Sequence, residues 1–238
     1  MPAVETVVVI PALNEEATIA SVVAGVRRSV SGALVIVVDD GSRDRTADLA
    51  SGAGAEVLRM PFNCGIGAAV QAGLRAAVAL GAARVVRLDG DGQHDPADTE
   101  RLLAAVAAGA DCAIGSRFRD GAGSYRSSFV RRIGIRWFAT ALRAAGVCGV
   151  TDPTSGFFAA NRAATRHLAE HYASDYPEVD AVVRLARAGF RLAEVPVAMH
   201  ERGGGVSSIG AFASIGYMVK VTAAILVAWL DTARARRA

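Results

Sequence analysis

The chain has 238 residues, of which 52% are hydrophobic, and its 26 Lys and Arg residues against 23 Asp and Glu residues give a formal net charge of +3. This composition excludes a disordered or fibrous chain and is typical of one large domain, or one domain with an appendage, that buries a core. The basic residues gather locally, in 117–136 and 234–237, so the sequence does not favour nucleic acid as a partner.

The cysteines and the N-terminal segment bear on the cellular compartment. Cys64, Cys112 and Cys148 are odd in number and form no CxxC pair, which predicts neither a disulfide framework nor a zinc site. No basic leader precedes the first hydrophobic run, so we expect no signal peptide. A cytosolic location fits both observations.

Short runs rich in β-branched residues alternate with alanine-rich stretches of helical length in the first part of the chain. We expect strands over residues 6–10, 34–38, 56–58 and 84–88. Helices are expected to begin near Glu15, Asp44 and Gly65. This alternation predicts an α/β fold, in which a mostly parallel central sheet has helices on both faces and binds ligands at the carboxyl ends of its strands.

The alternation becomes less regular after the fourth strand. We expect a helix over about 96–108, a strand near 112–114 and a helix around 130–144 within an arginine-rich stretch. A second short set of elements reaches about Met199. The chain is therefore predicted to form one domain over 1–208, followed by a C-terminal helix with a basic tail over 209–238.

The apolar stretch 209–230 carries Lys220 at its centre, so its uninterrupted runs fall well short of the roughly twenty residues that a membrane span needs. Its apolar residues recur at helical spacing, and arginines follow it. We predict an amphipathic helix that lies on a membrane surface or docks on a membrane partner. A terminal helix packed on the sheet and a true membrane span are the alternatives.

Polar residues follow the first two predicted strands. Pro11 is expected to stop the first strand, and Asn14 can cap the next helix. The second strand ends in Asp39 and Asp40. A turn with a helix cap would explain this pair. Two carboxylates at the mouth of a parallel sheet are nevertheless costly unless donors such as a base N–H or a ribose hydroxyl meet their lone pairs, which favours ligand binding.

The fourth strand is followed by the segment DGDGQHDP, which begins at Asp89. The carboxylates of Asp89 and Asp91 are one residue apart, and the amide of Gln93 comes two residues later. Oxygen ligands on a tight loop suit a hard divalent cation that keeps positions open for phosphate oxygens. Calcium loops and surface turns share the D-x-D pattern, but its place after a parallel strand favours a metal site held by these three residues.

Together the motifs resemble the family 2 glycosyltransferases of GT-A fold, and within them the dolichyl or polyprenyl phosphate mannose and glucose synthases. PALNEE, VVDDGS, NCGIG, DGDGQHDP, GSR and DPTSGF occur in the order and at the spacings of that family. The resemblance covers most of the chain. It implies an inverting enzyme that uses Mg²⁺ or Mn²⁺ to move a hexose from a nucleoside diphosphate sugar to a polyprenyl phosphate.

The resemblance implies which residues hold the nucleotide sugar. They are Pro11, Leu13, Glu15, Asp39, Asp40, Gly65, Asp89, Gly90, Asp91 and Arg202. Asp40 would accept hydrogen bonds from the base, and Asp91 would be a catalytic metal ligand. Arg202 would act catalytically from a glycine-rich loop over the diphosphate, where the family often has Lys in place of Ser208. Gly65 is equally explained as a plain helix cap.

On the acceptor side the resemblance implies a phosphate that is already ionised near pH 7, so His94 and His200 are interpreted as structural rather than as bases. Arg117, also catalytic, and Arg131 would hold that phosphate. A solvated helix face is the alternative for any arginine of this segment. Arg126, Arg132 and Arg136 compete for the same role.

Two rival functions stay open. A family 2 reaction onto a saccharide or small-molecule hydroxyl would need a carboxylate base, for which Glu178 and Asp180 are available unless they only cap a helix. The other rival is a non-catalytic sugar-nucleotide-binding subunit, against which the intact D-x-D argues. The family implies a cytoplasmic protein, peripheral at the inner face of the cell membrane, held by lipid or by a small membrane-protein partner. Neither the nucleotide base nor the hexose follows from these residues.

Overall fold

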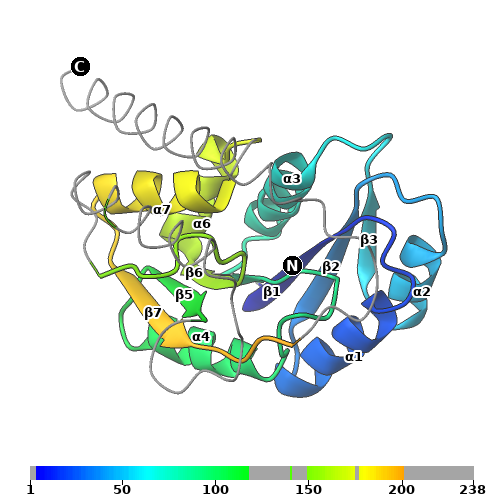
Figure 1. Cartoon of the computed structure of the whole chain (residues 1–238), viewed down its shortest axis with the longest axis horizontal. Helices are drawn as coiled ribbons and strands as arrows, with labels where there is room; N and C mark the ends of the chain where they lie inside the picture. Colours follow the sequence, from blue (N-terminus) through cyan, green and yellow to red (C-terminus); the bar gives the residue numbers. More distant parts are fainter. Residues whose placement is uncertain (1–3, 118–139, 141–148, 175–176, 201–238) are drawn as a thin grey trace.

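The computed structural model describes residues 4–117, 140, 149–174 and 177–200 (Figure 1). Its strands are β1 (Thr6–Ala12), β2 (Leu34–Asp39), β3 (Glu56–Arg59), β4 (Arg84–Arg87), β5 (Cys112–Ser116), β6 (Phe158–Asn161) and β7 (Leu192–Pro196). Its helices are α1 (Ile19–Ser29), α2 (Thr46–Gly52), α3 (Ile66–Ala79), α4 (Asp98–Ala107), α6 (Arg162–His171) and α7 (Pro177–Arg187). The α/β class expected from the alternating pattern is confirmed.

One sheet runs through the described part of the molecule in the strand order β3-β2-β1-β4-β6-β5-β7. The pairs β1–β2, β1–β4, β2–β3 and β5–β7 are parallel. β6 is antiparallel to both of its neighbours, β4 and β5. The sheet is therefore mostly parallel, as predicted, with one reversed strand that the sequence pattern did not indicate.

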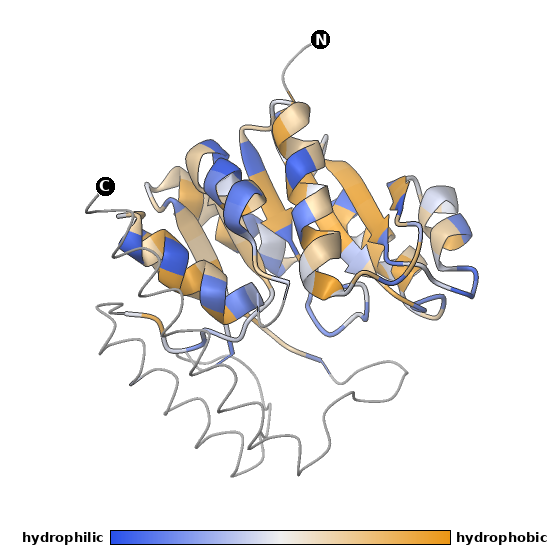
Figure 2. Cartoon of the chain, turned by 90° about the horizontal axis from the view of Figure 1, so that it is seen from above, coloured by the Kyte–Doolittle hydropathy of each residue, from blue (hydrophilic) through white to orange (hydrophobic). Residues whose placement is uncertain are grey.

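Alternating residues of the strands pack into separate apolar layers on the two faces of the sheet. Val7 and Val9 of β1 pack with residues of α3, α6 and α7. Val8 and Ile10 pack with residues of α1, α2 and α4 on the other face. The strands accordingly appear mostly hydrophobic between helices that carry hydrophilic residues (Figure 2). Burial on both faces explains why the strands are near-continuous apolar runs.

The first helix begins later than the sequence indicated, and its predicted cap is wrong. Asn14 has a φ of +55°, and its side-chain oxygen accepts a hydrogen bond from the N–H of Arg43 at 2.9 Å. Helix α1 has Thr18 as its N-cap residue and begins at Ile19. Asn14 joins two loops because its short polar side chain tolerates the left-handed region and reaches the neighbouring turn.

Pro11 does not stop the first strand, which continues to Ala12. Its Cα pairs with Val38 of β2, whereas β4 pairs with β1 only over residues 6–9. A missing N–H at position 11 therefore removes no ladder bond to β4, which is why a proline is tolerated inside a central strand. The prediction was wrong because the sequence does not show where the neighbouring strand ends.

Several predictions lie outside the described residues. These are the helix around 130–144, the C-terminal helix and basic tail of 209–238, and the arginines Arg126, Arg131, Arg132, Arg136 and Arg202. Among the helices that the structure does describe, none combines the length and the apolar composition needed to cross a membrane.

Candidate active site

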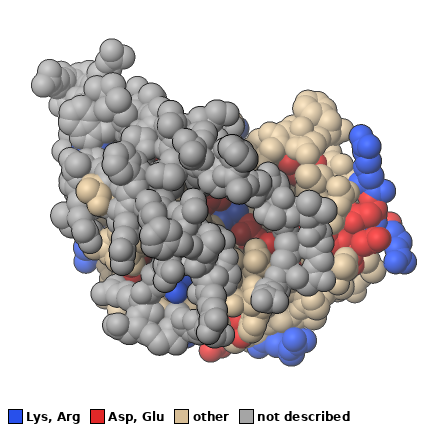
Figure 3. Space-filling view, viewed as in Figure 1, with Lys and Arg blue, Asp and Glu red and all other residues tan. Residues whose placement is uncertain are grey.

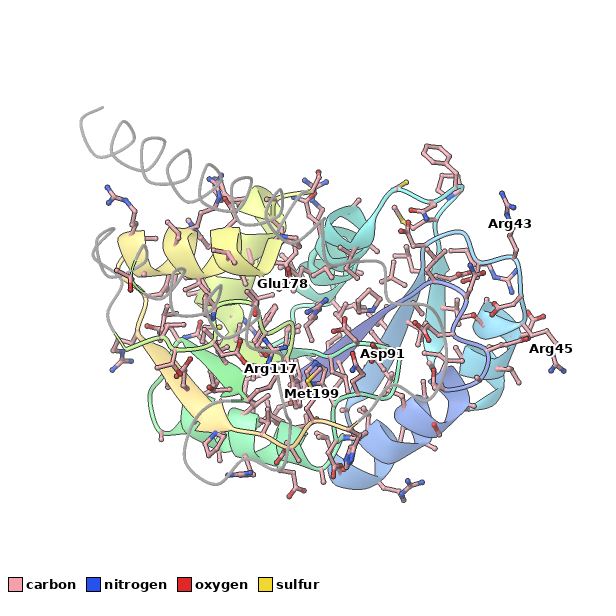
Figure 4. All side chains as sticks on the ribbon, viewed as in Figure 1. Arg43, Arg45, Asp91, Arg117, Glu178 and Met199 are labelled. Atoms are coloured by element: carbon pink, nitrogen blue, oxygen red, sulfur yellow. The ribbon has the colours of Figure 1, made fainter. Side chains whose placement is uncertain are left out.

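The motif residues meet at the carboxyl edge of the sheet. β2, β1 and β4 are neighbours and parallel, so the loops that follow them lie side by side at that edge. Figure 4 shows Asp91 near the middle of this edge, facing Arg117 and Glu178, with Arg43 and Arg45 at the far periphery. Acidic and basic atoms also meet near the middle of the same face in Figure 3. The arrangement brings the described residues among those predicted for the donor to the same edge of the sheet as Arg117.

The two carboxylates at the end of β2 are held by backbone N–H groups. Asp39 Oδ1 accepts from the N–H of Ser42 at 3.0 Å. Asp40 accepts from the N–H groups of Cys64 at 2.7 Å and Gly65 at 2.9 Å, one on each oxygen. The protein itself therefore supplies some of the hydrogen-bond donors that these two carboxylates need, and a ligand is not required to supply them all. Binding of a base by Asp40 stays a prediction.

Gly65 opens helix α3 in a conformation that favours glycine, with a φ of +89°. The N-terminus of a helix attracts anions, and here the carboxylate of Asp40 occupies the N–H of Gly65. Gly67 has a different reason, because a Cβ there would overlap the backbone of Ala173 and lie 2.6 Å from Ser174 O. Contact between Gly65 and the nucleotide stays a prediction.

The loop after β1 is anchored to its neighbours. Glu15 donates its N–H to Thr46 Oγ1 at 2.8 Å. Thr18 Oγ1 donates to Gly90 O at 2.7 Å, which joins this loop to the D-x-D segment. The side chain of Leu13 is exposed at the surface. Leu13 is thus available to a planar ligand such as a base, and its contact with the nucleotide stays a prediction.

The D-x-D loop folds tightly on itself. Asp91 is buried, and its Oδ1 accepts from the N–H of Gln93 at 3.0 Å. Asp89 is more exposed, with its Oδ1 2.7 Å from Arg87 Nη2 and its Oδ2 3.6 Å from His94 Nε2. The two carboxylates therefore differ in what holds them, because Asp89 pairs with the guanidinium of Arg87, whereas Asp91 accepts from a backbone N–H of its own loop.

This loop fits a divalent cation that takes most of its ligands from the substrate. Within the described ranges, no three His, Cys, Asp or Glu side chains converge in a way that could enclose a metal ion. The oxygen donors on the loop are two carboxylates and the amide of Gln93, which suits Mg²⁺ or Mn²⁺ that is otherwise bound by phosphate oxygens and water. Asp91 is the main candidate ligand because the guanidinium of Arg87, a positive charge that competes with a metal ion, is paired with Asp89.

Arg117 is fixed in a buried ion pair. Its Nε and Nη2 donate to the two oxygens of Asp152 at 2.7 and 2.6 Å, and Nη2 also donates to Thr154 Oγ1 at 2.7 Å. Asp152 in turn donates its N–H to Glu194 of β7 at 2.7 Å. The pair orients the guanidinium rigidly at the end of β5. Its role on an acceptor phosphate stays a prediction.

Sequence reasoning missed a second buried arginine. Arg87, the last residue of β4, is 1% exposed, and its Nη2 lies 2.7 Å from Asp89 Oδ1 and 3.5 Å from Glu178 Oε1. Burial alone would lower the pKa of Arg87, but Asp89, Tyr172 and Glu178 raise it above its ordinary value. A basic residue at the end of an apolar strand was the available signal.

Glu178 and Asp180 have different surroundings although both lie in the first turn of α7. Asp180 is buried and pairs with Arg184 of the same helix at 2.6 Å. Glu178 faces Arg87 and the D-x-D loop. Burial raises the pKa of the Glu178 carboxyl, and the Arg87 cation opposes that rise. Of the two carboxylates named for a hydroxyl acceptor, Glu178 is the one that faces the site.

The histidines have structural surroundings. His94 is buried, and its ring lies 5.0 Å from that of Phe157. It also forms a β-bridge with Met199, and the N–H of His200 donates to Gln93 O at 2.8 Å. The segment after β7 is thereby joined to the D-x-D loop (Figure 4). These contacts support the structural interpretation of His94, whereas the side chain of His200 is exposed and its interpretation stays a prediction.

Comparison with known proteins agrees with this geometry. The profile described as glycosyl transferase family 2 matches residues 7–169. The chain belongs to glycosyl transferase family 2. The enzyme is 34% identical over 244 residues to polyprenol monophosphomannose synthase of Mycolicibacterium smegmatis, covering 98% of this chain and 91% of the relative. It is also 34% identical to undecaprenyl-phosphate mannosyltransferase of Micrococcus luteus, covering 96% of this chain and 97% of that relative.

A solved structure shows the same fold. Glucosyl-3-phosphoglycerate synthase from Mycobacterium tuberculosis, in complex with Mn²⁺, UDP and glucosyl-3-phosphoglycerate, superposes with a TM-score of 0.73 at 28% identity, covering 94% of this chain and 79% of that chain. Another structure of that synthase contains Mg²⁺ and UDP. The glycosyltransferase described here therefore has the GT-A fold, which it shares with a synthase whose structures contain a divalent cation and UDP.

Proposed function

We propose that this glycosyltransferase moves a hexose from a nucleoside diphosphate sugar to a polyprenyl phosphate, with inversion at the anomeric carbon. The observation that carries the proposal is the extent of the likeness to the two mannosyl-transferring relatives. It covers 98% and 96% of this chain, whereas the family profile ends at residue 169. The likeness therefore extends over most of the chain beyond residue 169, the part to which α7, β7 and the predicted membrane-proximal helix belong.

The donor side supports this reaction. Asp91 and Gln93 would hold Mg²⁺ or Mn²⁺, which supplies charge neutralisation on the departing diphosphate when bound. Asp40 is kept in a fixed orientation by Cys64 and Gly65, as a residue that recognises a base requires. Arg202, two residues beyond the last described residue, would add a cation to the diphosphate.

The acceptor side supports a phosphate nucleophile. An ionised phosphate oxygen attacks the anomeric carbon without giving up a proton, so the site needs oriented cations rather than a base. Arg117 is oriented by Asp152, and Arg131 follows in the same basic segment. The domain of residues 1–208 would work beside a membrane-proximal helix and basic tail of 209–238, which hold the enzyme on the cytoplasmic membrane face.

A second candidate function has its own observation. The carboxyl of Glu178 faces the D-x-D loop and has a raised pKa, which suits a general base acting on a hydroxyl. The structural neighbour is named for glucosyl-3-phosphoglycerate, the product of transfer to a small phosphorylated acid. A soluble hydroxyl acceptor is therefore the alternative to the polyprenyl phosphate.

A transfer assay distinguishes the two functions. The purified full chain is incubated with GDP- and UDP-hexoses, Mn²⁺, and either polyprenyl phosphate in anionic vesicles or 3-phosphoglycerate in solution. We expect a charged glycolipid in the vesicle fraction, sedimentation of the enzyme with the vesicles, and no transfer to 3-phosphoglycerate. Transfer to 3-phosphoglycerate alone would overturn the proposal and support the second candidate. Omission of Mn²⁺ with added chelator is the control.

A further inference from the structure

Arg87 is the largest of the fully buried side chains in the described parts of the chain. It lies at the end of β4, beside Val9 of β1 on one side and Phe158 of β6 on the other. Burying a guanidinium is expensive unless carboxylates and hydrogen bonds compensate it. A methionine or leucine would fill this place without that cost, so the position of the charge calls for a reason.

The charge of Arg87 acts on two carboxylates from distant segments. Nη2 contacts Asp89 at 2.7 Å and lies 3.5 Å from Glu178. Nε and Nη1 have no hydrogen-bond partner among the residues that the structure covers. The cation is therefore directed at these carboxylates rather than distributed over backbone carbonyls. It lies between the D-x-D loop on the donor side and the start of α7 on the acceptor side.

Gly156 makes room for this guanidinium. A Cβ at position 156 would overlap Arg87 Nη1 and lie 2.6 Å from its Cζ. Because Arg87 is almost fully buried, the guanidinium would have to shift within the site and disturb its contact with Asp89. Gly156 and Arg87 are therefore matched in size. Glycine is needed at position 156 for the space that it leaves, not for its backbone conformation.

We propose that Arg87 is a positioning residue for sugar transfer, which orients the Asp89 carboxylate and keeps it balanced against Glu178. Without the cation, Asp89 and Glu178 would be two neighbouring carboxylates in a poorly solvated place and would repel each other. The Arg87 cation would also no longer compete with a divalent ion for the Asp89 carboxylate. Loss of Arg87 should therefore strengthen binding of the metal while it disturbs the geometry needed for transfer, two effects of opposite sign.

The opposite signs make the proposal testable, because general destabilisation would weaken both properties. In Arg87→Met we expect transfer to slow by about 10- to 100-fold. The affinity for Mn²⁺ in the presence of UDP or GDP, measured by titration calorimetry, should rise about three- to tenfold. Mn²⁺ binding equal to or weaker than wild type, in protein shown by circular dichroism to be folded, would overturn the proposal.

Further variants keep the test valid if Arg87→Met does not fold. Arg87→Lys retains the charge without the planar fork, so transfer should slow while Mn²⁺ affinity stays near wild type. Gly156→Ala should slow transfer by displacing the guanidinium, and the matched control Gly52→Ala, whose Cβ would meet nothing within 4 Å, should not. In Arg87→Met/Gly156→Ala the losses should not add, because the added methyl group then has room. Additive losses would contradict the proposal.

This inference rests on the proposed function only through the acceptor used in the transfer assay. The Mn²⁺ titration needs no acceptor. If polyprenyl phosphate proves to be the wrong acceptor, wild-type transfer fails while the shift in Mn²⁺ affinity between wild type and Arg87→Met remains. If instead wild-type transfer succeeds and that shift is absent, the proposed function stands and the role of Arg87 falls.

Discussion

The two halves of the sheet hold their buried carboxylates in different ways. In the half formed by β3, β2, β1 and β4, backbone N–H groups bind Asp39, Asp40 and Asp91. In the half that contains β6, β5 and β7, two buried carboxylates pair with arginines, Asp152 with Arg117 and Asp180 with Arg184, although Glu194 of β7 accepts from backbone N–H groups. Backbone dipoles orient a carboxylate without neutralising it, so Asp39, Asp40 and Asp91 keep their negative charge for a ligand, whereas Asp152 and Asp180 are each paired with a guanidinium that they orient.

Arg87 lies where the two halves meet. It belongs to a strand of the first half, but it pairs with carboxylates through its side chain, as the arginines of the second half do. Its partners are Asp89 of the D-x-D loop and Glu178 of α7. The difference between the halves therefore predicts different consequences of mutation. Loss of a backbone-held carboxylate should affect mainly ligand binding, and loss of a buried side-chain pair should affect folding stability in addition to any role that its arginine has in transfer.

The largest effect is expected for Asp91→Ala. Because Asp91 is the main candidate ligand of the metal, transfer should fall by about 10³-fold or more, and Mn²⁺-dependent binding of the nucleotide should disappear. Circular dichroism should show that the variant is folded, so that the loss of nucleotide binding reports on the metal site. Asp48→Ala, an exposed carboxylate of α2, is the matched control and should leave transfer unchanged. Retained Mn²⁺ dependence in Asp91→Ala would move the metal ligands elsewhere.

A smaller effect, on stability, is expected for Arg117→Met. Removing one partner of a buried pair leaves Asp152 charged and enclosed, which costs about 3 kcal/mol of unfolding free energy or somewhat more. The exposed pair of Arg59 and Asp48 offers a control, and Arg59→Met should cost less than about 1 kcal/mol. Urea denaturation measures both. Equal losses of unfolding free energy in Arg117→Met and Arg59→Met would show that the buried pair matters no more to stability than an exposed one.

The smallest effect is expected for Glu178→Gln and depends on pH. The pKa of Glu178 is raised in the folded protein, so the native state holds this proton more tightly than the unfolded chain does. The protonated Glu178 carboxyl therefore adds to the free energy of unfolding. This addition is fully present below the pKa of Glu178 in the unfolded chain and is lost as pH rises through its pKa in the folded protein. The stability of Glu178→Gln relative to wild type should therefore increase from acidic to neutral pH in urea denaturation. A difference that shrinks with rising pH would contradict the assignment.

The same contrast explains how much could be predicted from the sequence. The strands of the first half are continuous apolar runs, and their polar residues follow in short motifs, so these strands and the place of the D-x-D segment after β4 were predicted correctly. Asp40 and Gly65 were singled out, but the hydrogen bond between them was not, because it joins loops 25 positions apart. Local pattern thus identified the residues without their partners.

The second half was harder to predict because its organisation is long-range. β6 has four residues and runs opposite to its neighbours, and no local pattern shows a reversal of direction. Arg117 was expected to face a phosphate, and its pairing with Asp152 spans 35 positions. Arg87 was passed over because a basic residue ending a short strand is typical of a solvated strand end. Only the packing of α7 and Gly156 around it shows that it is buried.

The reversed strand β6 has a consequence for how the protein folds during synthesis. The strands from β1 to β4 can pair as soon as residue 87 has left the ribosome, whereas β6 begins only at residue 158. During that interval one edge of β4 has no partner and could join a strand of another nascent chain. Arg84 and Arg87 stand at the two ends of that four-residue strand. Charges so placed discourage such pairing, so the arginine that orients the active site would also protect the unfinished protein from aggregation.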